Sequence, residues 1–340
     1  MATVFHQDFP LDPFNTLRLP GNARRYAEIV SASQLIQLVR SGKLANERFF
    51  VLGGGSNLLV SGDVDATVLR MCIPGRELIA SDDDAHYVRV GAGENWHDFV
   101  VWTLEMGWPG LENLALIPGT VGAAPVQNIG AYGLEVCERF YSLEAVDLRS
   151  GALVSFDHAA CCFGYRDSIF KQDAANRFAI TSVTFRLPKR WQPLLRYVEL
   201  AREMAARALI TPSAQQMMEA VMAIRQRKLP DPDVIPNAGS FFKNPVISAE
   251  QCAELKKFNP DMPNFPQPDG KEKLAAGWLI EKCGWKGHSE GPVGMYEHQA
   301  LVLVNHGGAT GVDVLRVVAA VRRDVVERFG IALEMEPVVI

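Results

Sequence analysis

Residues 117–133 read IPGTVGAAPVQNIGAYG, and this stretch decides the fold. Glycine, alanine and proline dominate it, and Tyr132 is its only side chain that can carry a charge. Such small side chains have little apolar bulk to bury, and glycine loses more backbone entropy on folding than other residues. A backbone that must lie against a ligand explains this composition, and a long surface loop is the alternative. The main-chain N–H groups expected to cradle an anion or a flat polar ring are those of Gly119, Thr120, Gly122 and Ala123.

A second glycine-rich site, Gly53–Gly54–Gly55–Ser56–Asn57, directly follows the apolar segment 48–52. The spacing is not that of a Rossmann GxGxxG fingerprint, and the Lys–Ser/Thr pair of a P-loop is missing. Backbone amides, with the side chains of Ser56 and Asn57 as donors, suit a pyrophosphate. Alone, the site is equally compatible with a tight strand–turn–strand connection. Together with residues 117–133, it predicts one extended diphosphate ligand gripped from two sides.

The composition is that of a water-soluble globular protein. The 340 residues are 48% apolar and 21% charged, with a net charge of −5, which predicts two or three domains. A mildly acidic chain argues against nonspecific nucleic-acid binding. We expect no signal peptide, no membrane span and a cytoplasmic location. The six cysteines are expected to be reduced and mostly buried, and neither they nor the seven histidines show the spacing of metal ligands.

Local patterns predict alternating strands and helices. Strands are expected over residues 48–52, 67–72, 87–92, 138–147, 151–156, 179–187 and 300–305. Helices are expected over residues 31–39, 95–106, 211–228 and 311–329, with Ser31 and Thr211 as caps and Gly107 and Gly330 as stop signals. Residues 237–245 are expected to form a loop, and residues 188–193 a domain boundary. This order predicts a mixed α+β architecture rather than a doubly wound sheet.

Six motifs, in this order, carry a resemblance to a known family. They are FNTLRLP (14–20), VLGGGSNLLV (51–60), IPGTVGAAPVQNIGAYG (117–133), FGYRDSIFK (163–171), KLPDPDVIPNAGSFFKNP (228–245) and LEMEP (333–337). With them the chain resembles the type I branch of the UDP-N-acetylenolpyruvoylglucosamine reductases, flavoenzymes of bacterial peptidoglycan-precursor synthesis. The resemblance implies an α+β fold of the vanillyl-alcohol-oxidase/PCMH type, with FAD-binding subdomains over residues 1–72 and 73–198. A C-terminal α+β substrate-binding domain would span residues 199–340, its last residues returning to the active site.

The resemblance also implies where FAD binds. The pyrophosphate would lie on residues 53–57 and part of 117–124, and residues 127–132 would approach the flavin and its ribityl chain. The implied contacts are Gly53, Gly54, Gly55, Ser56, Asn57, Pro118, Gly119, Thr120, Gly122, Ala123, Gln127, Asn128, Ile129, Gly130, Ala131 and Tyr132. Because Ala123–Ala124 stands where some relatives have serines, the grip is expected to rest on main-chain N–H groups.

Arg166 and Ser240 are the first two candidate catalytic residues. Local sequence alone favours a surface ion pair with Asp167 for Arg166, and an ordinary turn residue for Ser240. The family implies that Arg166 stabilises the enolpyruvyl carboxylate, a task that suits a planar guanidinium. It implies that Ser240 donates a proton to the substrate, with Lys243 nearby as a helper.

Glu336 is the third catalytic candidate, and Glu334 is the alternative in the terminal Leu-Glu-x-Glu motif. Pro337 departs from the commoner family pattern and removes a backbone donor. The resemblance places the substrate's nucleotide end on Tyr197 and Lys228, with Asn244 as a further contact. A core-edge tyrosine and a helix-terminal lysine are the simpler alternatives for the first two.

The implied activity is the NADPH-dependent, FAD-mediated reduction of UDP-N-acetylglucosamine enolpyruvate to UDP-N-acetylmuramate, by a UDP-N-acetylmuramate dehydrogenase. We expect FAD and NADPH as cofactors, no metal, no nucleic-acid or membrane partner, and a monomer. Two alternatives stay open at this point. One is a flavin oxidase of the same fold that acts on an alcohol or sugar, and the other is a noncatalytic UDP-sugar-binding protein.

Overall fold

The computed structural model describes residues 3–45, 47–172 and 175–340 of the chain. The chain divides into two compact units that alternate along the sequence. The first unit takes Met1–Phe9, Ala23–Gly55 and Asp65–Arg225, and the second takes Pro10–Asn22, Ser56–Val64 and Gln226–Ile340. The chain therefore crosses from one unit to the other inside the glycine-rich site, between Gly55 and Ser56.

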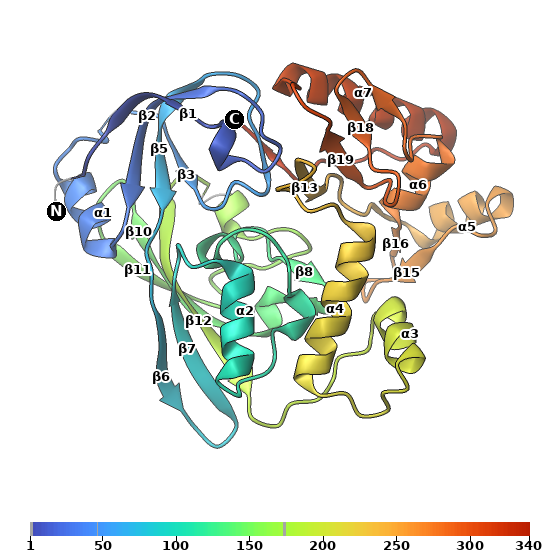
Figure 1. Cartoon of the computed structure of the whole chain (residues 1–340), viewed down its shortest axis with the longest axis horizontal. Helices are drawn as coiled ribbons and strands as arrows, with labels where there is room; N and C mark the ends of the chain where they lie inside the picture. The colour runs from blue at the N-terminus through green and yellow to red at the C-terminus, as the bar shows by residue number, and fades with distance from the viewer. Residues whose placement is uncertain (1–2, 46, 173–174) are drawn as a thin grey trace. The chain divides into compact units, whose positions relative to one another are not determined.

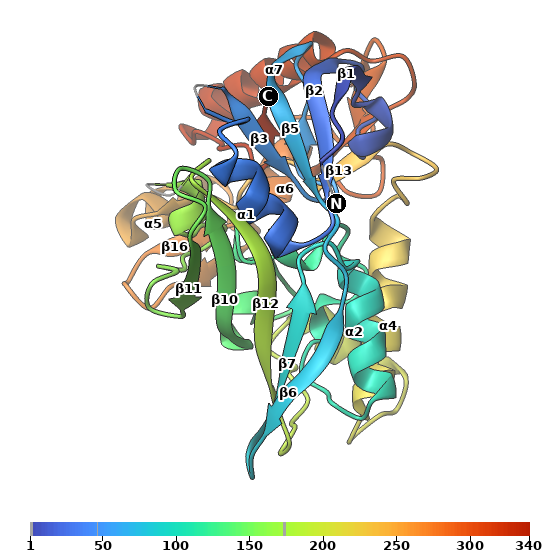
Figure 2. The same ribbon diagram turned by 90° about the vertical axis from the view of Figure 1, so that its left-hand side faces the viewer.

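The largest sheet of the first unit has five antiparallel strands in the order β11–β10–β12–β7–β6 (Figures 1 and 2). The strands are β6 Arg76–Ser81, β7 Ala85–Gly91, β10 Phe140–Asp147, β11 Leu153–Asp157 and β12 Phe178–Pro188. In the central strand, Val183 lies opposite Val90 of β7 and Leu143 of β10, and all three are buried. Four of these strands were expected from the sequence. Strand β6 was not, because its mostly exposed residues lack an apolar alternation.

A second sheet precedes it in the chain, with strand order β1–β2–β5–β3. Its strands are β1 His6–Pro10, β2 Asn22–Ile29, β3 Phe49–Leu52 and β5 Val64–Met71. Strands β3 and β5 run parallel, with Val51 opposite Leu69. Helix α1 (Ala32–Arg40) begins where the sequence predicted, because the Ser31 hydroxyl accepts a hydrogen bond of 3.1 Å from the Gln34 N–H.

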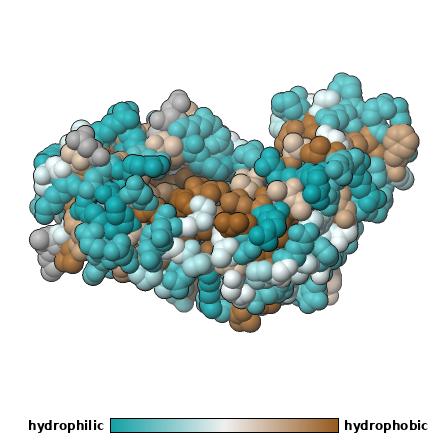
Figure 3. All heavy atoms as spheres, turned by 90° about the horizontal axis from the view of Figure 1, so that it is seen from above, coloured by the Kyte–Doolittle hydropathy of each residue, from teal (hydrophilic) through white to brown (hydrophobic). Residues whose placement is uncertain are grey.

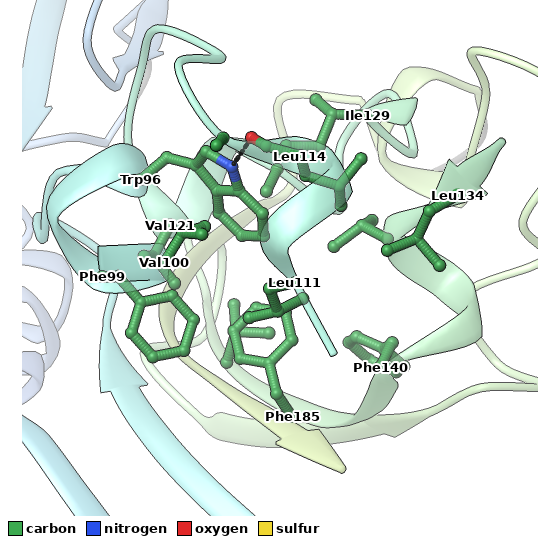
Figure 4. Close-up of a cluster of buried hydrophobic side chains, with 14 of the residues drawn as sticks. Trp96, Phe99, Val100, Leu111, Leu114, Val121, Ile129, Leu134, Phe140 and Phe185 are labelled. Carbon is green, nitrogen blue, oxygen red and sulfur yellow. Dashed lines mark hydrogen bonds between the residues drawn. The ribbon is translucent and has the colours of Figure 1, made fainter. Parts of the chain in front are cut away.

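Helix α2 (Trp96–Glu105) anchors the core of the first unit. Trp96, Phe99 and Phe185 are fully buried with their rings in contact, and Trp96 Nε1 donates to the Leu114 carbonyl at 2.9 Å (Figure 4). A buried indole is stable only if its N–H finds such an acceptor. Trp96 therefore belongs to the hydrophobic core of the first unit.

Helices α3 (Val198–Ala206) and α4 (Ala214–Lys228) follow the large sheet. Met217, Val221 and Ile224 of α4 are fully buried in the same core as Trp96, as the helical periodicity predicted. The predicted cap, Thr211, is wrong. Ser213 occupies the position next to the first turn, where its Oγ accepts from the Gln216 N–H and its N–H donates to Gln216 Oε1.

The second unit contains a sheet of order β13–β19–β18–β17, a small sheet of order β14–β16–β15, and three helices. The strands are β13 Asn237–Ser240, β14 Val246–Ile247, β15 Asn264–Pro266, β16 Glu272–Leu274, β17 Ser289–Glu290, β18 Val293–Met295 and β19 Val302–Asn305. The helices are α5 Ala249–Phe258, α6 Ala276–Lys282 and α7 Gly311–Phe329. Helix α7 has its predicted bounds, set by a Thr310–Asp313 capping box and by Gly330 at φ 67°.

Short elements complete the structure. The strand pairs are β4 Leu58–Leu59 with β20 Val338–Val339, which run parallel, and β8 Gly130–Ala131 with β9 Leu134–Glu135. The 3₁₀ turns are η1 Asp12–Phe14, η2 Glu112–Leu114, η3 Val121–Ala123, η4 Val136–Glu138 and η5 Ile169–Lys171. Both glycine-rich stretches thus lie in or beside short elements, and strand β20 directly follows the LEMEP motif.

Two further expectations are corrected. Residues 237–240 form strand β13 rather than a loop, because Asn237 and Ser240 pair with β19 about sixty residues later. All six cysteines are free thiols, as expected, but they are not mostly buried. Cys161 and Cys252 are buried, Cys162 is exposed, and the other three lie between these extremes.

Polar side chains cover most of the face drawn in Figure 3, where apolar side chains gather only in places. This pattern matches a chain in which charged residues make up 21% of the sequence. Among the described residues, no helix is both long and apolar enough to cross a membrane.

Candidate active site

The two glycine-rich stretches lie against each other within the first unit. A Cβ added to Gly54 would lie only 2.8 Å from the Cα of Gly119, and one added to Gly53 would lie 2.7 Å from Thr120 Oγ1. Contacts this short leave no room for a side chain. The structure therefore brings together residues 53–54 and 119–120, which are separated by about 65 positions in the sequence.

The hydroxyl of Thr120 is the clearest sign that this place serves a ligand. Its Oγ1 is buried and has no hydrogen-bond partner among the described residues. A buried polar atom left without a partner costs about 1–3 kcal/mol, so such atoms call for an explanation. A ligand that bonds Thr120 and lies along the glycine backbones would supply one. The residues present thus fit a polar, extended cofactor such as FAD.

The expected cradle of four main-chain N–H groups is only partly available. The Gly122 N–H donates to the Ala92 carbonyl at 2.9 Å, and the Ala123 N–H donates to the Thr120 carbonyl at 3.1 Å. Two of the four N–H groups expected to cradle a ligand therefore have main-chain partners in this structure. Gly122 is glycine for a packing reason, because a Cβ there would lie 2.5 Å from the Ala92 Cβ.

The loop of residues 127–132 is held in an unusual backbone conformation. Asn128 and Tyr132 have positive φ values, 45° and 48°, which side-chain-bearing residues rarely adopt. The buried Asn128 amide donates to Glu135 Oε2 at 2.9 Å and to the Gly164 carbonyl at 3.0 Å. Its Oδ1 accepts from the Cys137 N–H at 3.0 Å. Asn128 therefore shapes this loop with its side chain, which the sequence pattern assigned to the cofactor.

Arg166 is directed at the same loop. Its Nη2 donates to the Gly130 carbonyl at 2.6 Å, and its guanidinium lies 5.2 Å from the centroid of the Tyr165 ring. Asp167, its alternative partner by sequence, instead accepts from the Ser168 N–H and the Gln172 side chain. Gly164 and Asp167 exchange backbone hydrogen bonds, so Arg166 lies in a tight turn.

Tyr197 lies at the start of α3, beside Tyr132. Their ring centroids are 5.2 Å apart at an interplanar angle of 79°, an edge-to-face arrangement. The Tyr197 side chain is 41% exposed, so it is not a core residue. Within the first unit, the predicted substrate residue Tyr197 therefore contacts the predicted cofactor residue Tyr132.

Ser240 and Glu336 both belong to the second unit, where their backbones are neighbours. Ser240 ends strand β13, after Gly239 at φ 67°. The Glu336 N–H donates to the carbonyl of Phe241, the residue that follows Ser240, at 3.0 Å. Glu336 is only 8% exposed. A carboxylate this close to the end of the chain is ordinarily solvated, so its burial sets it apart.

The other members of the predicted set have structural partners. Glu334 is exposed and forms an ion pair with Lys243, which the sequence pattern placed beside Ser240 as a helper. Asn244 Oδ1 accepts from the Ala276 N–H at 3.0 Å, at the first residue of α6. Lys228 is the last residue of α4. No group of His, Cys, Asp and Glu in the described residues could hold a metal ion.

Sequence reasoning missed Arg225, which lies near Tyr132, and His97, which lies near Arg225. Burial lowers the pKa of Arg225, against the opposing effect of nearby Tyr132. Burial also lowers the pKa of His97, and Arg225 lowers it further, whereas Asp98 raises it. His97 Nδ1 accepts from the Leu116 N–H at 3.2 Å, as a neutral imidazole does. The sequence signal that could have identified Arg225 is its position one helical turn after Val221, on an apolar face of the helix.

Comparisons with known proteins identify two matching family models and several close relatives. Residues 230–340 match the family model described as UDP-N-acetylenolpyruvoylglucosamine reductase, C-terminal domain, and residues 23–157 match the FAD binding domain model. The UDP-N-acetylenolpyruvoylglucosamine reductase of Dechloromonas aromatica is 57% identical over 331 residues, which cover 96% of this chain and 97% of that protein. The one from Paraburkholderia phymatum is 55% identical over 336 residues, covering 98% and 97%.

A solved structure resembles the whole chain. The crystal structure of UDP-N-acetylenolpyruvylglucosamine reductase from Thermus caldophilus superposes with a TM-score of 0.67 at 24% identity, covering 100% of this chain and 99% of that one. This likeness, with the FAD-binding domain match, confirms the predicted fold class.

Proposed function

The chain belongs to the UDP-N-acetylenolpyruvoylglucosamine reductase family, and we propose that it reduces UDP-N-acetylglucosamine enolpyruvate to UDP-N-acetylmuramate. This reaction is a step of peptidoglycan-precursor biosynthesis and makes the protein a UDP-N-acetylmuramate dehydrogenase. One observation carries the proposal: 57% identity to a reductase of this name over 96% of the chain. The oxidase and noncatalytic alternatives are not favoured, because residues 230–340 match the reductase C-terminal domain.

We propose that the residues of the two glycine-rich stretches and of the loop 127–132 hold FAD. The close approach of Gly54 to Gly119 and the buried Thr120 hydroxyl support this assignment. Bound FAD would supply the redox chemistry, a hydride relay between NADPH and the vinylic C3 of the substrate. The protein contributes orientation, charge and protons.

Ser240 is the proposed proton donor to C2 of the substrate. An alcohol is a weak acid, but an enolate-like carbon is basic enough to take its proton. Strand β13 fixes the residue, because Ser240 pairs with Val302 of β19 and the buried Asn237 side chain accepts from the Gly239 N–H at 2.9 Å. A donor held this firmly transfers its proton without first being ordered.

Arg166 and Glu336 are the proposed electrostatic pair. The Arg166 guanidinium would hold the substrate carboxylate as negative charge develops there. The choice of Glu336 over Glu334 rests on burial, because Glu336 is 8% exposed and Glu334 is exposed and paired with Lys243. The hydrogen bonds on either side of Pro337, donated by the Glu336 N–H and the Val338 N–H, also hold the local backbone in one conformation.

We further propose that Tyr197, Lys228 and Asn244 contact the nucleotide end of the substrate. The exposed edge of Tyr197 beside Tyr132 supports this role for the first of them. The functional division would be residues 1–72 and 73–198 for FAD and residues 199–340 for substrate. We expect a monomer that acts in the cytoplasm, where NADPH and UDP-sugars occur, without nucleic-acid or membrane partners.

A titration of the two half-reactions tests the proposed function. The purified protein should show flavin absorbance that bleaches with NADPH and returns when the enolpyruvyl substrate is added anaerobically. Bleaching without recovery would exclude this substrate. Recovery equally fast with oxygen alone would instead favour the oxidase alternative.

A further inference from the structure

The C-terminal tail of the second unit changes partner at Pro337. Before the proline it runs antiparallel to residues 241–243, and the Glu336 N–H donates to the Phe241 carbonyl at 3.0 Å. After it, strand β20 runs parallel to β4, and the Val338 N–H donates to the Asn57 carbonyl at 3.0 Å. Proline has no N–H, so the change of partner leaves no donor unpaired at that position.

Asn57 contacts the tail on both sides of this proline. Its main-chain carbonyl accepts from Val338, and its side-chain Nδ2 donates to the Glu336 carbonyl at 3.1 Å. The main chain of Glu336 is therefore bonded at both its N–H and its carbonyl. These two hydrogen bonds set the direction of the Glu336 Cα–Cβ bond, and Pro337 further restricts the backbone of the residue before it.

We propose that Asn57 is a positioning residue for Glu336, a role that rests on the proposed function of Glu336. Sequence reasoning gave the Asn57 side chain to the cofactor pyrophosphate, whereas the structure gives it to the backbone of Glu336. One residue of the GGGSN motif thus orients the buried carboxylate by holding the peptide that follows it. Without the Asn57 amide, the Glu336 carbonyl loses the hydrogen bond that fixes this peptide, and the carboxylate shifts.

Two substitutions test the amide itself. Asn57→Ala removes the side chain, and Asn57→Asp keeps its shape but replaces the donor with an oxygen that repels the Glu336 carbonyl. Both should slow flavin reoxidation by the enolpyruvyl substrate about 10- to 100-fold, as expected for a displaced catalytic group, with little change in the substrate dissociation constant. A wild-type rate for Asn57→Asp would overturn the proposal.

Ser61→Ala is the matched control. The Ser61 hydroxyl donates to the Ile340 carbonyl at 2.7 Å, so this variant also loosens the tail, but four residues beyond Glu336. Both Asn57→Ala and Ser61→Ala should speed amide hydrogen exchange in a peptide covering residues 334–340. Only the Asn57 variants should slow reoxidation. Equal slowing in Ser61→Ala, or unchanged exchange in Asn57→Ala, would contradict a specific role.

A double-mutant cycle separates positioning from general damage. If Asn57 acts through Glu336, Asn57→Ala should slow reoxidation much less in a Glu336→Gln background than in the wild type. Slowing by the same factor in both backgrounds would overturn the proposal. If Asn57→Asp loses bound flavin but the remaining flavin is reoxidised at the wild-type rate, the Asn57 side chain serves the cofactor instead of positioning Glu336.

Failure of the positioning role and failure of the proposed function give different results. If wild-type protein is not reoxidised by the enolpyruvyl substrate, the proposed function is wrong. The exchange comparison still reports whether Asn57 restrains the Glu336 segment. If the wild type reacts and the cycle shows no coupling, only the positioning role is wrong.

Discussion

Arg166 Nη2 lies 2.6 Å from the carbonyl oxygen of Gly130, which ties a proposed catalytic guanidinium to the loop proposed to approach the flavin. Arg166 itself has φ 55°, a conformation that costs a residue with a side chain about 1 kcal/mol or more. The turn of Gly164 and Asp167 maintains this conformation. A guanidinium has five N–H donors in a planar fork, a geometry that suits a carboxylate.

Arg166→Lys should retain the positive charge but lose the planar fork. We expect reoxidation by the enolpyruvyl substrate to slow about 100-fold or more, because a transition-state donor is removed. Flavin reduction by NADPH should change much less. Rapid-mixing absorbance measurements follow both steps, and equal slowing of the two would argue against a role confined to the substrate.

Gly54→Ala should weaken FAD binding. The new Cβ would lie 2.8 Å from the Gly119 Cα, a backbone atom that can move only with its whole turn. Overpacking of this kind costs about 1–3 kcal/mol, which corresponds to a loss of affinity of roughly 5- to 150-fold. Gly62→Ala is the control, because a Cβ added there would have nothing within 4 Å of it and its φ needs no glycine. Equal flavin affinity in both variants would refute the close-contact argument.

Thr120→Val replaces the buried hydroxyl with a methyl group of similar size. Without flavin, the variant should be at least as stable as the wild type, because an unpaired buried oxygen is removed. FAD affinity should fall about fivefold, the value of one ordinary hydrogen bond. Thermal unfolding of the flavin-free protein checks the expected stability, and flavin titration checks the expected affinity. Unchanged affinity would show that the hydroxyl does not serve the cofactor.

Ser240→Ala should slow only the step that needs its proton. Loss of a general acid costs about 10²- to 10⁴-fold, so substrate-driven reoxidation should fall by that factor while NADPH-driven bleaching proceeds normally. Solvent deuterium should slow the wild-type step and have a smaller effect in the variant. If bleaching is lost as well, Ser240 is not simply an acid.

The neutral His97 should make stability depend on pH. Burial is the main cause of its lowered pKa, so the unfolded chain binds the proton more readily than the folded one. This contribution is complete above the ordinary pKa of 6.5 and is lost as pH falls through the lowered folded value. The free energy of unfolding in urea should therefore fall more between pH 7.5 and pH 5 in the wild type than in His97→Gln. An identical fall would show that His97 does not titrate this way.

Elements with local signals could be predicted from the sequence. Helix α7 is an example, because Thr310 and Gly330 mark its ends and apolar residues recur along one face. Strand β3 is another, since four apolar residues stand directly before the glycines. The motifs likewise indicated which residues to consider for the site. In each case the deciding interactions lie within a few positions of each other in the chain.

Features that depend on distant partners could not be predicted this way. Gly54 is glycine because of Gly119, and β13 is a strand because of β19. The Asn57 side chain bonds a residue 279 positions away, so its local sequence indicated only a polar donor after glycines. Asn128 is a similar case, because its buried amide donates to Glu135 and to the Gly164 carbonyl, 36 positions away.

The parallel pairing of β4 with β20 has a consequence during synthesis on the ribosome. Leu58 pairs with Val338, which is translated 280 residues later. At about 5–20 residues per second, β4 waits roughly 14 to 56 seconds for its partner strand. The nascent chain thus carries the apolar segment Leu58–Leu59 before the strand that pairs with it has been made. The pairing of β4 with β20 should therefore be among the last contacts of the fold to form during synthesis.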